Sequence, residues 1–88
     1  MKYKVIVDRK AYKELDQIPA NDAEKISQVI LNLADNSRPI GCKKLEMKMS
    51  LYRIRQGNYR IIYTIDDKDK IINVVGVGHR KDIYREMN

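Results

Sequence analysis

The sequence predicts a small α+β fold in which an antiparallel helical hairpin covers one face of an antiparallel β-sheet. Three observations predict this fold. A short β-branched segment opens the chain, two stretches with helical spacing of apolar residues follow, and after Gly41 the apolar residues recur at every second position. The chain has 88 residues, which suits one small domain, so we expect a single domain over residues 1–88.

The first predicted element is a strand over residues 3–7, because this segment is short and rich in β-branched side chains. Asp8 is then expected to cap a helix over residues 9–18, in which the apolar residues recur with helical spacing. Proline cannot continue a helix, so Pro19 is expected to end it.

A second helix is expected to begin after an N-cap at Asn21 or Asp22 and to continue to about residue 36. Its apolar stripe includes Ile26 and Ile30, which lie one turn apart on the same side. Because the link between the two helices is short, we expect them to form an antiparallel hairpin.

The second half of the chain is expected to form an antiparallel meander. Apolar and polar residues alternate from Leu45 to Leu51, as they do in a half-buried strand. Gly57-Asn58 is a two-residue hairpin signal, and the acid-rich residues 66–70 indicate a longer hairpin loop. Strands are expected over residues 52–55, 59–65 and 71–77, and a short C-terminal helix is expected over residues 80–87.

The composition argues against a disulfide, a metal centre and a membrane span. Cys42 and His79 are the only cysteine and the only histidine, so neither an internal disulfide nor a zinc site is expected. No apolar run approaches the roughly 18 residues needed to cross a bilayer, and residues 1–15 lack the pattern of an export signal. We therefore expect a cytoplasmic protein that uses no metal and no cofactor.

Positive charge is concentrated in one quarter of the chain. The net charge is +6, and residues 43–63 hold six basic residues against Glu46 alone. A concentrated basic patch attracts polyanions, which are either nucleic acid or an acidic protein. A solvated face that only improves solubility is the alternative interpretation.

The two-residue turn at positions 57–58 predicts the register of the strands on either side of it. In this register Arg55 faces Arg60 directly, and Arg53 projects from the same face of the hairpin as both. Like charges that oppose each other destabilise a hairpin, and such broken local rules are expected where function requires them. We therefore interpret the three arginines as an anion-binding site on the exposed side of the hairpin.

Two segments resemble the RelE branch of the RelE/ParE toxin superfamily. They are residues 51–63, LYRIRQGNYRIIY, and residues 77–84, VGHRKDIY, and the resemblance extends over essentially the whole chain. It implies a RelE-like fold akin to that of microbial ribonucleases. It also implies a type II toxin that enters the ribosomal A site and cleaves messenger RNA during translation. A RelB-type antitoxin would neutralise this toxin in a heterodimer or heterotetramer.

The resemblance also implies roles for individual residues. Arg53 and Arg55 occupy the two basic positions at which well-studied relatives have lysines. Arg60 matches the arginine after the Gly-x-Tyr turn, Arg80 matches the arginine after the last strand, and Tyr84 stands near the C-terminal tyrosine of the family. Because arginine does not lose its proton in proteins, neither Arg53 nor Arg55 can act as the general base.

Metal-free RNA cleavage uses the ribose 2′-hydroxyl as nucleophile, so it needs a proton acceptor, a proton donor and cations that stabilise the charged phosphorane. The guanidinium fork matches phosphate oxygens, which makes the four arginines candidates for this stabilisation. Tyr84 could stack on a base or assist proton transfer. His79 is a candidate acid–base catalyst because histidine ordinarily titrates near neutrality, and a structural hydrogen bond is its alternative role. The further basic residues expected to bind RNA are Lys43, Lys44, Lys48 and Lys81.

Two other interpretations stay open at this level. A ParE-like toxin that inhibits DNA gyrase without nuclease activity would share the fold and the antitoxin. A decayed toxin, kept only as an antitoxin-binding partner, is also compatible with arginine at both lysine positions. The arginine cluster together with Arg80 and Tyr84 favours phosphate chemistry, so an endoribonuclease is the leading hypothesis.

Overall fold

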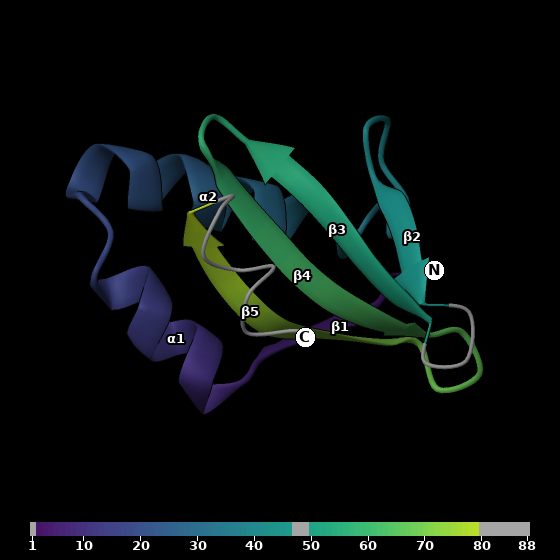
Figure 1. Ribbon diagram of the computed structural model, residues 1–88. Coiled ribbons are helices and arrows are strands. Elements are labelled where there is room, and N and C mark those ends of the chain that lie inside the picture. Colours follow the sequence, from purple (N-terminus) through teal and green to yellow (C-terminus); the bar gives the residue numbers. More distant parts are fainter. Residues whose placement is uncertain (1, 47–49, 80–88) are drawn as a thin grey trace.

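The structure, a computed structural model, describes residues 2–46 and 50–79, and within these ranges the chain forms two helices and five strands (Figure 1). They are, in chain order, β1 (Lys4–Val7), α1 (Arg9–Asp16), α2 (Ala20–Asn32), β2 (Lys43–Glu46), β3 (Leu51–Gln56), β4 (Tyr59–Asp66) and β5 (Ile71–His79). The short helix expected over residues 80–87 lies outside the described residues.

The strands form a five-stranded sheet in the order β1-β5-β4-β3-β2. The pairs β2–β3, β3–β4 and β4–β5 are antiparallel, as the predicted meander requires. Strand β1 instead pairs in parallel with β5, from Lys4 opposite Ile71 to Val7 opposite Val74. The α+β fold class is therefore confirmed, and the sheet is mixed because the first strand lies beside the last described one.

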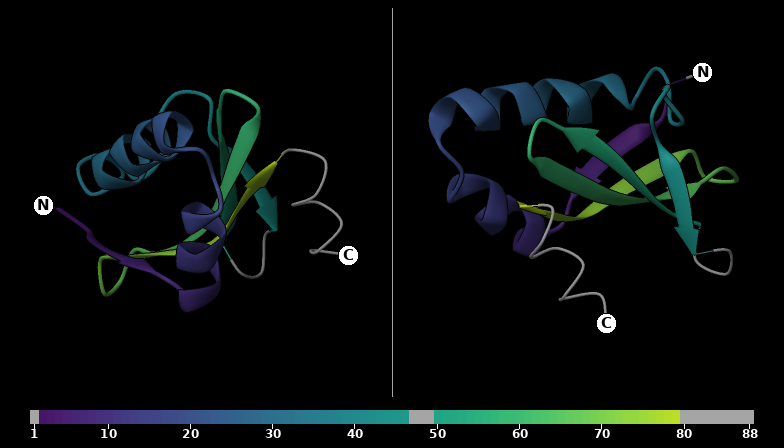
Figure 2. Two further views of the ribbon diagram at one scale, coloured as in Figure 1. Left: turned by 90° about the vertical axis from the view of Figure 1, so that its left-hand side faces the viewer. Right: turned by 45° about the horizontal axis from the view of Figure 1, so that its top comes forward.

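Both helices pack on one face of the sheet, with α1 against β5 and α2 against β3. Figure 2 shows that the two helices meet at one end and open apart, so that each covers a different part of the sheet. Neither described helix is long and apolar enough to cross a membrane. Neither described helix covers the opposite face of the sheet, and this face carries Arg53, Arg55 and Arg60.

The ends of α1 are set by the backbone more than by the predicted cap. Asp8 stands at the N-cap, but its side chain makes no capping hydrogen bond, and its carbonyl accepts the Tyr12 N–H at 2.8 Å. The helix ends at Asp16, two residues earlier than predicted, because the next two N–H groups bond to carbonyls three residues back.

Helix α2 begins earlier than predicted, because Pro19 itself stands at the N-cap in an extended conformation. Asn21 and Asp22 therefore lie inside its first turn rather than at its cap. The helix also ends earlier than predicted. Its last turn tightens, and the Ala34 carbonyl accepts the Tyr3 N–H at 2.9 Å instead of continuing the helix.

The main core lies between the helices and the sheet. A buried isoleucine or leucine of this kind contributes about 1.5–3 kcal/mol. Tyr63 is fully buried there, and its hydroxyl donates to the Ser37 carbonyl at 2.9 Å. Burial raises the pKa of the Tyr63 phenol. The apolar residues buried in this core are Ala11, Ile26, Ile30, Leu33, Tyr52, Ile54, Ile61, Tyr63, Ile65, Ile72, Val74 and Val77.

A polar network ties the start of the chain to two loops. The Arg38 guanidinium binds both carboxylate oxygens of Asp67, at 2.9 and 3.3 Å, and donates from Nε to the Tyr52 hydroxyl at 3.2 Å. The Tyr3 hydroxyl also donates to Asp67. The bonds from Arg38 and Tyr3 lower the pKa of Asp67 to about 2. The network therefore holds the α2–β2 loop against the β4–β5 turn.

Candidate functional site

The hairpin of β3 and β4 has the register that its turn predicts. Arg55 pairs with Arg60, Arg53 pairs with Ile62, and Gly57 takes the left-handed backbone conformation in the turn, with a φ of 60°. Cross-strand partners share a face, so all three arginines project from the same side of the sheet. We call this surface, formed by Arg53, Arg55 and Arg60, the arginine face.

Burial of the other side of the hairpin explains why this register is held. Tyr52, Ile54, Ile61 and Tyr63 alternate with the arginine-face residues and are buried against the helices. A slip of one residue would turn these four side chains away from the core and put charged ones into it. The packing that stabilises the fold therefore also gathers the arginines.

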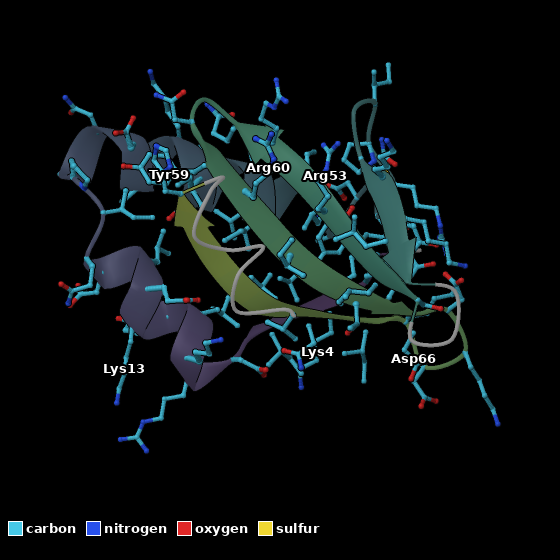
Figure 3. All side chains as sticks on the ribbon, viewed as in Figure 1. Lys4, Lys13, Arg53, Tyr59, Arg60 and Asp66 are labelled. Carbon is cyan, nitrogen blue, oxygen red and sulfur yellow. The ribbon has the colours of Figure 1, made fainter. Side chains whose placement is uncertain are left out.

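The three arginines differ in exposure, and the expectation that they lie on an exposed surface is wrong for Arg60. Its exposed fraction is only 5%, whereas Arg53 is half-buried and Arg55 is exposed. Arg60 lies on β4, an interior strand of the sheet with β3 and β5 on either side. Figure 3 shows Arg53 on β3 and Arg60 on the neighbouring strand β4.

Several guanidinium N–H groups on this face are buried without a hydrogen-bond partner. Within the described residues, Nε of Arg53 and both Nε and Nη1 of Arg60 donate to no protein acceptor. No ion pair in residues 2–46 and 50–79 joins these arginines to a carboxylate. A buried charged donor is costly unless an acceptor meets it, so the site favours an anion.

The acidic residue on these two strands lies too far away to neutralise the arginine face. Asp66 ends β4, six residues beyond Arg60, which corresponds to roughly 20 Å along an extended strand. Its carboxylate instead accepts the N–H groups of Lys68 and Asp69 in the following turn, both at 3.1 Å. The positive potential around Arg60 is therefore not cancelled by its own strand.

Glycines of β5 lie next to the arginine face. Gly78 pairs with Arg60, and Gly76 pairs with Ile62. Because glycine has no side chain, β5 places only backbone opposite Arg60 at this position. The guanidinium can donate two parallel hydrogen bonds to a phosphate.

A small apolar cluster adjoins the arginines on the same face. Leu51 and Ile62 are buried there, with Leu45 and Val75 packed against them. The face therefore combines a cationic end near the turn with an apolar end farther along the strands. This combination suits either stacked nucleotides or an amphipathic peptide.

The other predicted site residues are not all brought to this face. Lys43 pairs with Arg53 and joins it, whereas Lys44 lies on the opposite side, with its Nζ 5.7 Å from the centre of the Tyr52 ring. His79 also projects to the helix-covered side, because it pairs with Tyr59 and meets the edge of that ring at a centroid distance of 6.0 Å. Lys48, Arg80, Lys81 and Tyr84 lie outside the described residues.

Residues 5–84 match the sequence model of the family described as ParE toxin of type II toxin-antitoxin system, parDE. The chain belongs to this family.

Relatives place this ParE-family toxin beside proteins named RelE. It is 27% identical to the mRNA interferase toxin RelE of Escherichia coli K12, over 98% of this chain and 94% of the relative. Its fold matches the archaeal RelE-RelB complex from Pyrococcus horikoshii with a TM-score of 0.84 and 29% identity, over 93% of this chain and 99% of that chain. It also matches the RelB-RelE antitoxin-toxin complex from Methanococcus jannaschii with a TM-score of 0.73 and 28% identity. This match covers 94% of this chain and 99% of that chain.

These similarities confirm the resemblance to the RelE branch and the RelE-like fold. The chain is a RelE-type toxin of a toxin–antitoxin system.

Sequence reasoning missed one side chain that bonds to β5, the strand beside Arg60. Glu14 on α1 reaches the backbone of β5 and accepts the Val77 N–H at 3.0 Å. The two residues are 63 positions apart, so no local pattern pairs them. The available signal was a charged residue on the apolar stripe of the helix, between Ala11 and Ile18.

Proposed function

We propose that this toxin is a metal-independent, ribosome-dependent endoribonuclease that cleaves messenger RNA in the A site. The buried, unpaired donors of Arg60, flanked by Arg53 and Arg55, carry the proposal. They can donate hydrogen bonds to an anion, and no carboxylate among the described residues accepts these bonds. The mRNA interferase activity named for the Escherichia coli relative supports the same reaction.

In this reaction the 2′-hydroxyl oxygen attacks the adjacent phosphorus, and the bond from phosphorus to the 5′-oxygen breaks. The 2′-hydroxyl proton passes to an acceptor, and the leaving 5′-oxygen takes up a proton. Arg53, Arg55 and Arg60 stabilise the extra negative charge of the phosphorane. Removing one preorganised donor of this kind costs roughly 10²–10³ in rate.

The remaining predicted residues take secondary places in the proposal. Arg80 adds a further cation, and Tyr84 stacks on a base or assists proton transfer. Lys43 extends the cationic face toward the RNA backbone. The location of His79 beside Tyr59 gives it a packing contact, and a part in proton transfer would require RNA to reach the helix-covered side of the sheet at the end of β5.

The ribosome supplies positioning that so small a protein lacks. Holding the 2′-hydroxyl in line with its phosphate removes a large entropic part of the barrier. The toxin is therefore expected to cleave messages on cytoplasmic ribosomes and to act weakly on free RNA. Cleavage of the message would inhibit translation.

A RelB-type antitoxin is the proposed protein partner, in a heterodimer or heterotetramer. The solved relatives from Pyrococcus horikoshii and Methanococcus jannaschii are complexes of RelE with RelB. A net charge of +6 suits an acidic antitoxin segment that folds on the toxin surface.

Primer extension on cellular messages after brief induction tests the proposed reaction. Wild-type toxin is expected to produce breaks in phase with codons, and Arg60→Ala or Arg80→Ala is expected to abolish both the breaks and the growth arrest. Each variant should still bind antitoxin, which shows that it is folded. Intact messages together with a DNA-damage response would instead support inhibition of DNA gyrase, the activity of the ParE-like alternative.

A further inference from the structure

Strand β5 extends well beyond the strand that borders it on one side. Pairing with β1 stops at Val74, where the Asp8 N–H donates to the Val74 carbonyl at 2.9 Å. The strand continues to His79, and helix α1 packs beside this extension. The last five residues of β5 therefore have helix rather than strand beside them on this side.

A carboxylate takes the place of the missing strand at this edge. Oε1 of Glu14 accepts the Val77 N–H at 3.0 Å in a partly buried position. An ionised acceptor makes a stronger hydrogen bond than a neutral carbonyl, and shielding from water strengthens it further. Without such a bond, the end of an edge strand is prone to local opening.

We propose that Glu14 is a positioning residue of the RNA-cleaving site, which holds the end of β5 beside Arg60. This proposal rests on the proposed function. Val77 pairs with Ile61, and Gly78 pairs with Arg60, so the bond to Val77 is made one residue from the partner of Arg60. Fixing Val77 fixes the bare backbone that flanks the buried guanidinium.

The effect of Glu14 is one of position rather than of charge. The helix that carries Glu14 packs on the face of the sheet opposite the arginines. Its carboxylate therefore does not compete with phosphate for the guanidinium groups. Glutamine at this position keeps an oxygen acceptor and loses the charge. A Glu14→Gln variant therefore separates the contribution of the hydrogen bond from that of the negative charge.

The test compares Glu14→Ala with Glu14→Gln, and uses Asp16→Ala as a control for loss of an exposed acidic side chain on the same helix. Amide hydrogen exchange is measured at Val77, and kcat and KM are measured for cleavage of messenger RNA on ribosomes. We expect Glu14→Ala to speed exchange at Val77 and to lower kcat roughly 10–100-fold, because small displacements at a reacting centre have effects of this size. KM should change little, Glu14→Gln should restore most of kcat, and Asp16→Ala should match the wild type.

Distinct outcomes separate this proposal from the proposed function. Unchanged kcat in Glu14→Ala, or a Glu14→Gln variant with protected Val77 but the low kcat of the alanine variant, would overturn the positioning role. Wild-type protein that leaves messages on ribosomes intact would overturn the proposed function itself. In that case amide hydrogen exchange would still test whether Glu14 protects the Val77 N–H. If exchange at Val77 were the same in Glu14→Ala as in the wild type, the positioning proposal would lose its structural basis as well.

Discussion

Arg55 and Arg60 face each other directly across the β3–β4 hairpin, on the side of the sheet away from the helices. Two like charges in this relationship oppose strand pairing. The buried tyrosines and isoleucines on the other side of the hairpin hold the pair together. Stability and the proposed anion binding therefore make opposite demands on this pair of residues, and both can be measured.

Replacing Arg55 by glutamate should stabilise the fold and abolish RNA cleavage. An opposite charge facing Arg60 changes the cross-strand contribution by about 0.2–1 kcal/mol, which corresponds to a rise of about 1–8 °C in Tm. The new carboxylate would also occupy the donors that phosphate needs. Thermal melting and ribosome-dependent cleavage measure the two effects. Arg55→Gln serves as the control without a carboxylate, and a lower Tm for Arg55→Glu than for Arg55→Gln would contradict the prediction.

Replacing Arg60 by methionine should likewise raise stability while removing activity. Methionine keeps an unbranched apolar stem but removes a buried charge whose donors are unpaired. We expect the free energy of unfolding to rise by about 1 kcal/mol or more, and cleavage to fall by roughly 10²–10³. Denaturant unfolding and cleavage assays give the two values.

Lys13→Met, on the exposed surface of α1, controls for the loss of one positive charge. It should leave cleavage near the wild-type rate. A less stable Arg60→Met protein would mean that the guanidinium is satisfied in solution, and the anion site would lose its physical basis.

Adding a side chain opposite Arg60 on β5 should block the site. Gly78→Val places a β-branched side chain, which suits a strand, next to the guanidinium. Cleavage is expected to fall roughly tenfold or more because phosphate can no longer reach its bonding distance. The Tm should be equal to or above that of the wild type. Cleavage at the wild-type rate would show that substrate does not approach over β5.

The Arg38–Asp67 pair predicts how stability depends on pH. The pKa of Asp67 is lowered to about 2 from its ordinary value of 3.8, so the contribution of the pair is present above pH 3.8 and is lost as pH falls through about 2. Asp67→Asn should melt at a lower temperature than the wild type at pH 7, and the difference should shrink between pH 4 and pH 2. A difference that is constant over this range would show that the carboxylate charge does not matter.

The arginine face could be predicted from sequence because its geometry is local. The two-residue turn at Gly57-Asn58 sets the pairing, and the alternation of Tyr52 and Ile54 with arginines decides which face is buried. Both signals lie within a few residues of Arg55. The helices were predicted for a similar reason, since their apolar spacing is contained in each segment.

The features that escaped prediction depend on segments far apart in the chain. The parallel pairing of Lys4 with Ile71 and the bond from Val77 to Glu14 both join residues more than sixty positions apart. The burial of Arg60 is likewise not given by the local strand pattern, which predicts only the face from which it projects. Helix boundaries shifted because Pro19 and the Ala34 carbonyl, rather than the predicted caps, set them.

The parallel contact between β1 and β5 also has a consequence for the order of assembly. The N-terminal strand leaves the ribosome first, but its neighbour is made after nearly all of the chain. Because β5 inserts between β1 and β4, the hydrophobic interior cannot close until residue 79 has emerged, and such non-local pairing is slow. The β3–β4 hairpin can pair locally before this point, but the sheet that supports it is completed only when β5 joins β1.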